Sequence, residues 1–276
     1  MNNIKLFASD LDGTFFKDDR SFDEDMFKQI LSQLKQEGKY FVVSSGRSFN
    51  GIDGTFKKFN QKNEIAYIGQ NGGLVYVNGK VIFESSIDEI YIDKIYQAIP
   101  KISALPQRTA FEGRNITFIP DFIDSKLINT MIKRYSGNNL SIIHSSKDIT
   151  EPIQKISLFW EKQDQKLLAQ ELISKTGLQG LRTTSSGYGA LDIINDGISK
   201  SVGLKRLGEY LNIHGEEMAA FGDGENDLEM LYYVGYPFVM PNAPEFIKSK
   251  FNNTQIAIAD NVHSGVLKTI AQIIKK

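Results

Sequence analysis

The chain has 276 residues, with 32 basic and 33 acidic side chains and a net charge of −1. This length can bury one large core or two smaller ones, and the balanced charge gives no field that would attract nucleic acid or an anionic membrane. It has no cysteine, which excludes disulfides, thiolate metal sites and cysteine nucleophiles. With no signal peptide evident and no apolar run longer than a strand, we expect a soluble, cytoplasmic globular protein.

The first predicted element is a buried strand over 4–8 that leads into two aspartates, Asp10 and Asp12. Residues two apart on a strand point the same way, and open α/β sheets bind ligands at the carboxyl ends of their strands. We therefore expect both carboxylates at one ligand site, where a cation or a shared proton would relieve their repulsion. Taken alone, the stretch is equally typical of a strand that ends in an Asp-Gly turn at Gly13.

A helix with apolar residues at helical spacing follows, and then a second buried strand over 40–43. Strand, helix and strand in this order predict a parallel sheet with right-handed crossovers. Ser45 and Gly46 then lie on the same edge as Asp10, where a hydroxyl and a backbone N–H suit a phosphate oxygen, with Arg47 close by. A polar turn before a helix explains this motif equally well on its own.

The third predicted strand, over 65–68, ends in a glycine-rich loop. Asn71 and Gly72 lie in this loop, which can bring backbone close to a ligand. A hairpin follows over 74–83, with Asn78-Gly79 as the signal of a type I′ turn.

The pattern changes between residues 85 and 188, where we predict a separate α+β unit inserted into the parallel domain. The expected helices lie near 90–98, 125–134 and 166–174, and the expected strands near 116–119, 140–143, 155–160 and 181–184. We find no catalytic constellation here. Four side chains are of types that often contact ligands, but we expect each to be a surface or packing residue: Arg108, Arg114, His144 and Trp160.

The α/β pattern is expected to resume at residue 189, with a strand over 190–194 and a helix that Ser199 caps and Lys200 opens. A lysine in the first turn of a helix opposes the helix dipole. Lys200 therefore suits a position where it meets an anion, although most lysines are merely solvated.

The most specific signal after the N-terminus is the acidic loop that follows a strand over 218–221. Its four oxygen-bearing side chains are Asp223, Glu225, Asn226 and Asp227. A solvated acidic turn is the simpler interpretation, and a calcium loop is conceivable without the ligand spacing of an EF-hand. A further strand ends near Asn242, and we expect Asn261 to cap a last helix that runs through Lys275.

Together these motifs resemble the haloacid dehalogenase superfamily, and within it the Cof-type branch with a large class IIB cap. The motifs that carry the resemblance are Asp10–Thr14 for the first, Ser45-Gly46-Arg47 for the second, Lys200 for the third and Gly222–Asp227 for the fourth, with Asn71-Gly72 and Met240–Ala243 similar to signatures of the branch.

The resemblance implies an α/β fold with a Rossmann-like parallel core, residues 1–84 and 189–276, and an inserted α+β cap, residues 85–188. It implies a Mg²⁺-dependent phosphatase that hydrolyses small phosphorylated metabolites through an aspartyl-phosphate intermediate. The partner would be a small phosphate ester, with no nucleic acid and no membrane. The oligomeric state is not indicated.

The resemblance also implies roles for single residues. Asp10 would be the nucleophile and Asp12 the general acid and base. The metal would be held by Asp10, the Asp12 carbonyl and Asp223, with Asp227 in the outer shell of the metal site. The phosphate contacts would be Leu11, Ser45, Gly46, Lys200 and Asn226, and the contacts to the rest of the substrate Arg47, Asn71, Gly72 and Asn242.

Two other functions stay open: a phosphosugar mutase or other phosphotransferase of the same superfamily, and a non-catalytic metabolite-binding module. The chain also departs from the family pattern. Phe15 and Phe16 stand where an aliphatic pair is usual, which we expect to affect packing only. His263-Ser264 replaces the usual acidic residue before Gly265-Val266.

Overall fold

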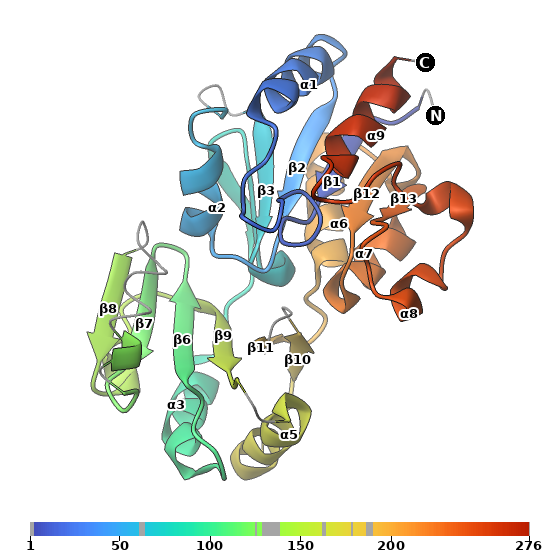
Figure 1. Ribbon diagram of the computed structural model, residues 1–276. Coiled ribbons are helices and arrows are strands. Elements are labelled where there is room, and N and C mark those ends of the chain that lie inside the picture. The colour runs from blue at the N-terminus through green and yellow to red at the C-terminus, as the bar shows by residue number, and fades with distance from the viewer. Residues whose placement is uncertain are drawn as a thin grey trace. The chain divides into compact units, whose positions relative to one another are not determined.

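The computed structural model describes residues 3–60, 64–124, 126–128, 139–161, 164–177, 179–185 and 190–275. The chain divides into two compact units. The first consists of Met1–Arg47, Thr55–Phe83 and Ser199–Lys276, and the second of Ser48–Gly54 and Glu84–Ile198. Each unit is built on its own β-sheet (Figure 1).

The sheet of the first unit has, among the described residues, seven strands in the order β13-β12-β1-β2-β3-β4-β5. They are β1 (Leu6–Ser9), β2 (Tyr40–Ser44), β3 (Ile65–Gly69), β4 (Leu74–Val77), β5 (Lys80–Glu84), β12 (Met218–Gly222) and β13 (Tyr236–Val239). The pairs from β13 to β3 are parallel, and β4 turns back antiparallel to β3. The predicted Rossmann-like parallel sheet is confirmed.

Helices cover both faces of this sheet, because its central strands are apolar on both sides. Val42 of β2 belongs to a core formed with Leu204 of the helix Lys200–Leu211 and Met230 of the helix Leu228–Tyr233. Its neighbour Phe41 points the other way and packs on Phe27, with ring centroids 5.0 Å apart. The helices are α1 (Glu24–Gln36), α6 (Lys200–Leu211), α7 (Leu228–Tyr233), α8 (Glu245–Lys248) and α9 (Gly265–Ile274), with short 3₁₀ turns η1 (Gln70–Gly72), η4 (Gly215–Glu217), η5 (Glu225–Asp227) and η6 (Asn253–Gln255). A further helix, α2 (Phe49–Phe56), is divided between the two units.

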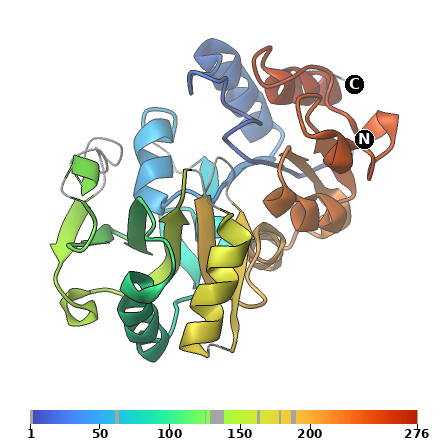
Figure 2. The ribbon, with the colours of Figure 1, turned by 60° about the horizontal axis from the view of Figure 1, so that its bottom comes forward.

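The second unit has a mostly antiparallel sheet with the strand order β10-β11-β9-β6-β7-β8 among the described residues. Its helices α3 (Glu89–Ala98) and α5 (Gln165–Thr176) lie side by side over one face (Figure 2). Apolar side chains such as Phe111, Ile156 and Ile193 pack in one core with those helices. The other elements are β6 (Arg108–Gly113), β7 (Ile116–Pro120), β8 (Asn139–Ile143), β9 (Ile153–Phe159), β10 (Leu181–Ser185), β11 (Ala190–Asn195), η2 (Ile99–Lys101) and η3 (Ser146–Asp148).

The strand expected over 190–194 exists but does not join the parallel sheet. β11 pairs antiparallel with β9 and β10, and the second unit extends to Ile198 rather than ending at residue 188. A buried apolar run identifies a strand, but it does not say which sheet the strand joins. The helix predicted over 125–134 falls mostly outside the described residues.

The four side chains singled out in the second unit all have partners there, as expected for surface and packing residues. Trp160 is buried and donates to the Ala104 carbonyl at 2.9 Å, and the Arg108 guanidinium carbon lies 3.8 Å from the Phe159 ring centroid. Arg114 forms an ion pair with Glu84. His144 Nδ1 lies 2.7 Å from Asp121 Oδ2. Within the described residues, no helix is both long and apolar enough to cross a bilayer.

Candidate active site

Three neighbouring strands of the first unit bring the predicted motifs to one edge of the sheet. β1 is flanked by β2 and β12, and all three are parallel. Ser9 is level with Val43 and with Phe221, so the residues that follow these positions leave the sheet at the same edge. Asp10, Ser45 and Asp223 therefore arrive together from segments far apart in the sequence.

Lys200 lies at the centre of the site, between two carboxylates. Its Nζ lies 2.6 Å from Asp10 Oδ1 and 2.6 Å from Asp227 Oδ1, and all three side chains are buried. Burial raises the pKa of Asp10 well above its ordinary value, although Lys200 acts in the opposite direction. Burial alone would lower the pKa of Lys200, but the two carboxylates raise it above its usual range, so the lysine is a fixed cation.

Asp223 is placed by the turn after the first motif. Thr14 Oγ1 donates to Asp223 Oδ1 at 2.7 Å. Gly13 has φ +79°, and a Cβ at that position would lie 2.4 Å from Asp223 Oδ2, so only glycine leaves room for the carboxylate. Burial and the nearby Asp227 carboxylate raise the pKa of Asp223 to about 6.

Asp227 is held by the backbone of its own loop. Its Oδ2 accepts from the N–H groups of Asp223 at 3.0 Å and Gly224 at 2.9 Å, while Oδ1 faces Lys200. Gly222 is required beside it, because a Cβ there would lie 2.4 Å from the Asp227 Cβ. The loop thus fixes one carboxylate in the middle of the site.

Among the described residues, one carboxylate oxygen each from Asp10, Asp223 and Asp227 lies within 4.8 Å of the others. An all-oxygen set of partly buried carboxylates suits a hard divalent cation such as Mg²⁺. The residues present therefore fit the metal that the sequence predicts. Both oxygens of Asp227 already accept hydrogen bonds, which supports its assignment to the outer shell.

Asp12 is not part of this carboxylate cluster. Arg47 forms a two-pronged ion pair with it, in which Nε lies 2.7 Å from Oδ2 and Nη2 contacts Oδ1. The Asp12 side chain is 42% exposed and the Arg47 side chain is 27% exposed. The Asp12 carboxylate is thus turned toward Arg47, and the assignment of the Asp12 backbone carbonyl as a metal ligand stays a prediction.

Ser45 and the loop of the third strand are tied together by backbone hydrogen bonds. The Ser45 carbonyl accepts from the Asn71 N–H at 3.1 Å, and Asn226 Nδ2 donates to Asn71 Oδ1 at 3.2 Å. Gly72, with φ +99°, lies so close to α6 that a Cβ would be 1.9 Å from the Ser199 carbonyl. Ser199 caps α6 as predicted, so this loop supports the turn that carries Lys200.

Asn242 and Asn261 form hydrogen bonds to the backbone of the turn that follows β1. Asn242 Nδ2 donates to the Gly13 carbonyl at 2.7 Å, and Asn242 Oδ1 accepts from the Asn261 N–H at 3.2 Å. Asn261 Nδ2 donates to the Phe16 carbonyl at 3.0 Å. The prediction that Asn261 caps the last helix is wrong, because α9 begins at Gly265 after Ser264. No local sequence pattern indicates this supporting role.

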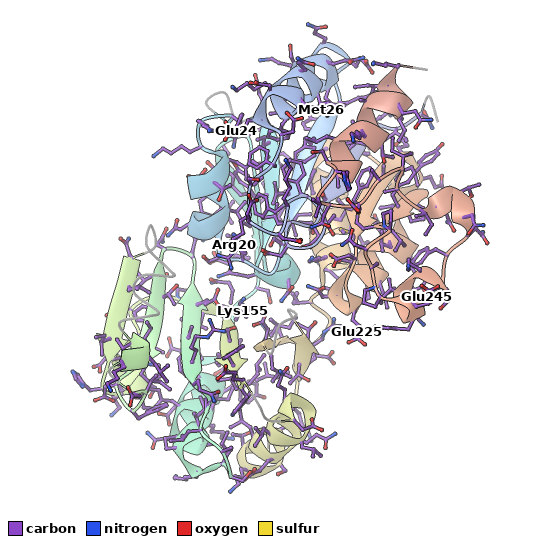
Figure 3. The ribbon with its side chains drawn as sticks, in the orientation of Figure 1. Arg20, Glu24, Met26, Lys155, Glu225 and Glu245 are labelled. Carbon is purple, nitrogen blue, oxygen red and sulfur yellow. The ribbon has the colours of Figure 1, made fainter. Side chains whose placement is uncertain are left out.

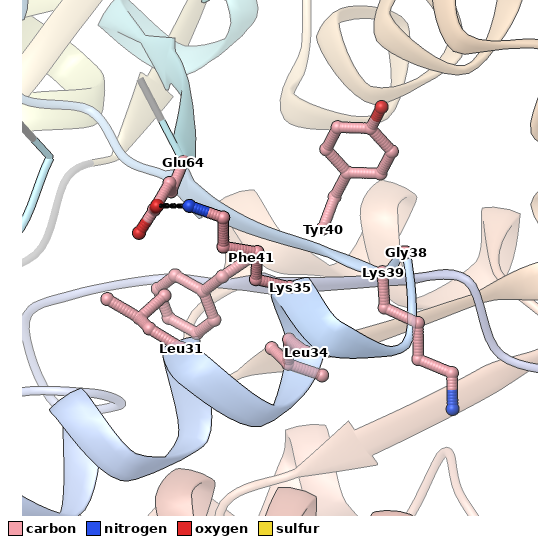
Figure 4. Close-up of a pocket in the computed structure, with 8 residues that line it drawn as sticks. All are labelled: Leu31, Leu34, Lys35, Gly38, Lys39, Tyr40, Phe41 and Glu64. Atoms are coloured by element: carbon pink, nitrogen blue, oxygen red, sulfur yellow. Dashed lines mark hydrogen bonds and ion pairs between the residues drawn. The ribbon is translucent and has the colours of Figure 1, made fainter. Parts of the chain in front are cut away.

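Two surface features do not belong to the site. Glu225, one of the four oxygen-bearing side chains of the acidic loop and labelled in Figure 3, is exposed and is not one of the three clustered carboxylates. A hollow lies at the amino ends of β2 and β3, the opposite edge of the sheet, where the Lys35–Glu64 ion pair crosses it (Figure 4). Since the ligand site of an open α/β sheet lies at the carboxyl ends, we assign this hollow no part in it.

A family model described as haloacid dehalogenase-like hydrolase matches residues 7–270. Among curated relatives, the 5-amino-6-(5-phospho-D-ribitylamino)uracil phosphatase YbjI of Escherichia coli strain K12 is 27% identical over 274 residues, which cover 99% of this chain and 97% of the relative. Among solved structures, SMU.1108c from Streptococcus mutans UA159 is similar with a TM-score of 0.87 and 26% identity, covering 99% of this chain and 100% of that one. The subclass IIB sugar phosphatase BT4131 shares the fold, with a TM-score of 0.77, 18% identity and coverage of 98% of both chains.

Proposed function

Since the chain belongs to the haloacid dehalogenase-like hydrolase family and is a phosphatase of that family, we propose that it hydrolyses small phosphate esters with Mg²⁺ through an aspartyl-phosphate intermediate. The observation that carries the proposal is the cluster of Asp10, Asp223 and Asp227 around Lys200. A site that only bound a metabolite would not need a second aspartate, Asp12, beside the nucleophile.

In the first half of the reaction, an Asp10 oxygen attacks phosphorus and the bond from phosphorus to the ester oxygen breaks. Asp12 gives its proton to the departing oxygen, so that the alcohol leaves neutral. In the second half, water attacks the aspartyl-phosphate while Asp12 takes one of its protons. Inorganic phosphate leaves, and the Asp10 carboxylate is restored.

The charges of the site suit this sequence of steps. Asp10 alone would repel the incoming phosphate, and the buried Lys200 offsets that repulsion. A divalent cation held by Asp10, Asp223 and the Asp12 carbonyl would supply further positive charge at the phosphoryl oxygens. We assign the remaining phosphate contacts to the predicted set: the hydroxyl of Ser45, the N–H groups of Leu11 and Gly46, and the amide of Asn226.

The substrate class is proposed from the named relative. The Escherichia coli protein is a phosphatase for 5-amino-6-(5-phospho-D-ribitylamino)uracil, a primary phosphate ester on a polyol chain. We propose that this chain also acts on a primary phosphate of a sugar or polyol chain. The predicted substrate contacts Arg47, Asn71, Gly72 and Asn242 are candidates for holding it.

A phosphate-ester panel tests the proposal. It includes 5-amino-6-(5-phospho-D-ribitylamino)uracil, hexose phosphates, FMN, pyridoxal phosphate and nucleotides, each with Mg²⁺ and with chelator. We expect release of inorganic phosphate from polyol or sugar phosphates, lost in chelator. Phosphorus NMR that showed isomer formation from a hexose 1-phosphate would indicate a mutase instead, and inactivity across the panel would indicate a binding module.

Replacement of the nucleophile gives the most direct mutational test. We expect Asp10→Asn to reduce turnover by more than about 10³-fold with the fold retained, because an amide cannot form the aspartyl-phosphate. The matched control is Asp25→Asn on the exposed side of α1, which should retain full activity. Phosphate release by the Asp10→Asn protein at the wild-type rate would contradict the assignment.

A further inference from the structure

Arg47 lies between an aromatic ring and a carboxylate. Its guanidinium carbon is 5.2 Å from the centroid of the Phe16 ring, and its forked nitrogens contact both oxygens of Asp12. Phe16 is buried, whereas Asp12 and Arg47 are partly exposed. The three side chains thus form a stack that runs from the core to the edge of the site.

The turn after β1 builds this stack. The Leu11 carbonyl accepts from the N–H groups of Thr14, Phe15 and Phe16 at 2.8–3.2 Å. An isolated backbone bridge joins Asp12 to Phe16. The chain therefore returns directly beneath Asp12 and presents the Phe16 ring there, where Arg47 arrives from the end of β2.

We propose that Phe16 and Arg47 are positioning residues for Asp12: the ring holds the guanidinium, and the guanidinium holds the carboxyl group that exchanges the proton. The inference rests on the proposed function, in which Asp12 protonates the leaving oxygen. It replaces the expectation that the Phe15–Phe16 pair affects packing only.

The physical argument starts from the exposure of Asp12. A half-exposed aspartate with no partner samples several rotamers, yet proton transfer requires a fixed approach to the leaving oxygen. Arginine fixes the plane of a carboxylate because its planar fork engages both oxygens. When one Asp12 oxygen takes up the proton that is later donated, the other oxygen keeps its hydrogen bond to Arg47 and the plane of the group is retained. A cation over an aromatic face is in turn held in place, and an aliphatic side chain at position 16 would offer no such face.

The role can be tested by the acidity of the leaving group. An alkoxide needs a proton to leave, whereas p-nitrophenolate leaves readily without one, so weaker positioning of Asp12 should affect alkyl esters most. The two probes are p-nitrophenyl phosphate and 5-amino-6-(5-phospho-D-ribitylamino)uracil. If the uracil compound is a poor substrate, the sugar phosphate that is hydrolysed fastest in the panel takes its place. The measured quantity is the ratio of kcat on the alkyl ester to kcat on the aryl ester.

We expect Arg47→Lys to lower this ratio about tenfold and Phe16→Leu about threefold, with KM little changed, since lysine cannot form the fork and leucine cannot hold the guanidinium. The double variant should be no worse than Arg47→Lys alone, because Phe16 acts through Arg47. The matched control is Phe15→Leu. This neighbouring buried ring packs on Phe22, Phe27 and Phe41, so its loss should lower stability but leave the ratio unchanged.

Three outcomes would overturn the inference. Equal effects of Phe15→Leu and Phe16→Leu on the ratio would reduce Phe16 to packing. A raised KM on both esters in Arg47→Lys, with the ratio kept, would make Arg47 a substrate contact only. An unchanged ratio in Asp12→Asn would show that Asp12 is not the acid, and the proposed function would then lose that step. A ratio that falls in Asp12→Asn but not in Arg47→Lys would reject this inference and leave the proposed function intact.

Discussion

The turn between Asp12 and Thr14 leaves no room for a side chain at Gly13. We predict that Gly13→Ala lowers kcat by about 100-fold and raises the Mg²⁺ concentration needed for half-maximal activity, because the added Cβ displaces the Asp223 carboxylate. Steady-state kinetics over a Mg²⁺ titration measures both effects.

Gly38→Ala is the matched control for this substitution. Gly38 also has a positive φ, +66°, but a Cβ there would meet nothing within 4 Å. Both variants should lose about 1 kcal/mol of stability to backbone strain in urea unfolding, and only Gly13→Ala should lose activity. Equal activity of the two variants would show that Asp223 does not need the space at Gly13.

At this scale the sequence predicts which residues gather but not how they pair. Asp10, Lys200 and Asp227 could be placed together because each lies at a strand end or helix start of known chemical type. The Asp12–Arg47 pair and the contacts of Asn261 could not, since they join residues 35 and 245 positions apart through side-chain rotamers that no local pattern encodes. Sequence spacing fixes backbone neighbours, whereas packing decides which oxygen meets which nitrogen.

In the second unit, the face of the middle strands opposite Phe111, Ile156 and Ile193 carries a buried charged group. Lys155 Nζ of β9 lies 3.3 Å from both Glu112 of β6 and Asp192 of β11. Burial raises the pKa of Glu112 although Lys155 acts to lower it. The folded protein therefore binds the Glu112 proton more tightly than the unfolded chain, so its contribution to stability is present below pH 4.5 and is lost as the pH rises through the folded pKa.

We predict that Glu112→Gln removes this contribution. The free energy of unfolding of the wild type, relative to that of the variant, should fall as the pH rises from 4.5 through the raised pKa of Glu112, by up to about 1.4 kcal/mol per pH unit. Urea unfolding across this range is the measurement, with the exposed Glu161→Gln as control. A difference between wild type and Glu112→Gln that stays constant with pH would contradict the shift.

The same charges explain why β6 escapes prediction from the sequence. The strand from Arg108 to Gly113 contains the buried charged residue Glu112. It therefore lacks the continuous apolar run that identifies β1 and β12 as strands. The sequence offers a helix after Arg47 only as an alternative and gives no bounds for α2, since two glycines lower its helix propensity. β11 is recognised as a strand and placed in the wrong sheet, because its partners β9 and β10 are chosen by packing across the whole unit.

At the scale of the whole molecule, the site gathers like charges that a bound divalent cation would neutralise. Asp10, Asp223 and Asp227 crowd three carboxylates around one lysine, and like charges at this distance disfavour the folded state. Neutralising one of them should therefore stabilise the metal-free protein. If the proposed function holds, Mg²⁺ binds the folded state and stabilises it, and the same substitution should weaken that stabilisation.

We predict that Asp223→Asn makes the protein more stable than the wild type without Mg²⁺ and less stable than the wild type with Mg²⁺. In chelator at pH 8 the variant should be more stable than the wild type by about 2 kcal/mol, because an amide keeps the Thr14 hydrogen bond and carries no charge. In excess Mg²⁺ the order should invert, since the wild type gains about 2.7 kcal/mol at a hundred times the Kd and the variant much less. Urea unfolding in both buffers measures the exchange, and Asp25→Asn should match the wild type throughout. A variant that is less stable in chelator as well would mean that the cluster holds Asp223 without repulsion, and the case for a cation at this edge of the sheet would fail.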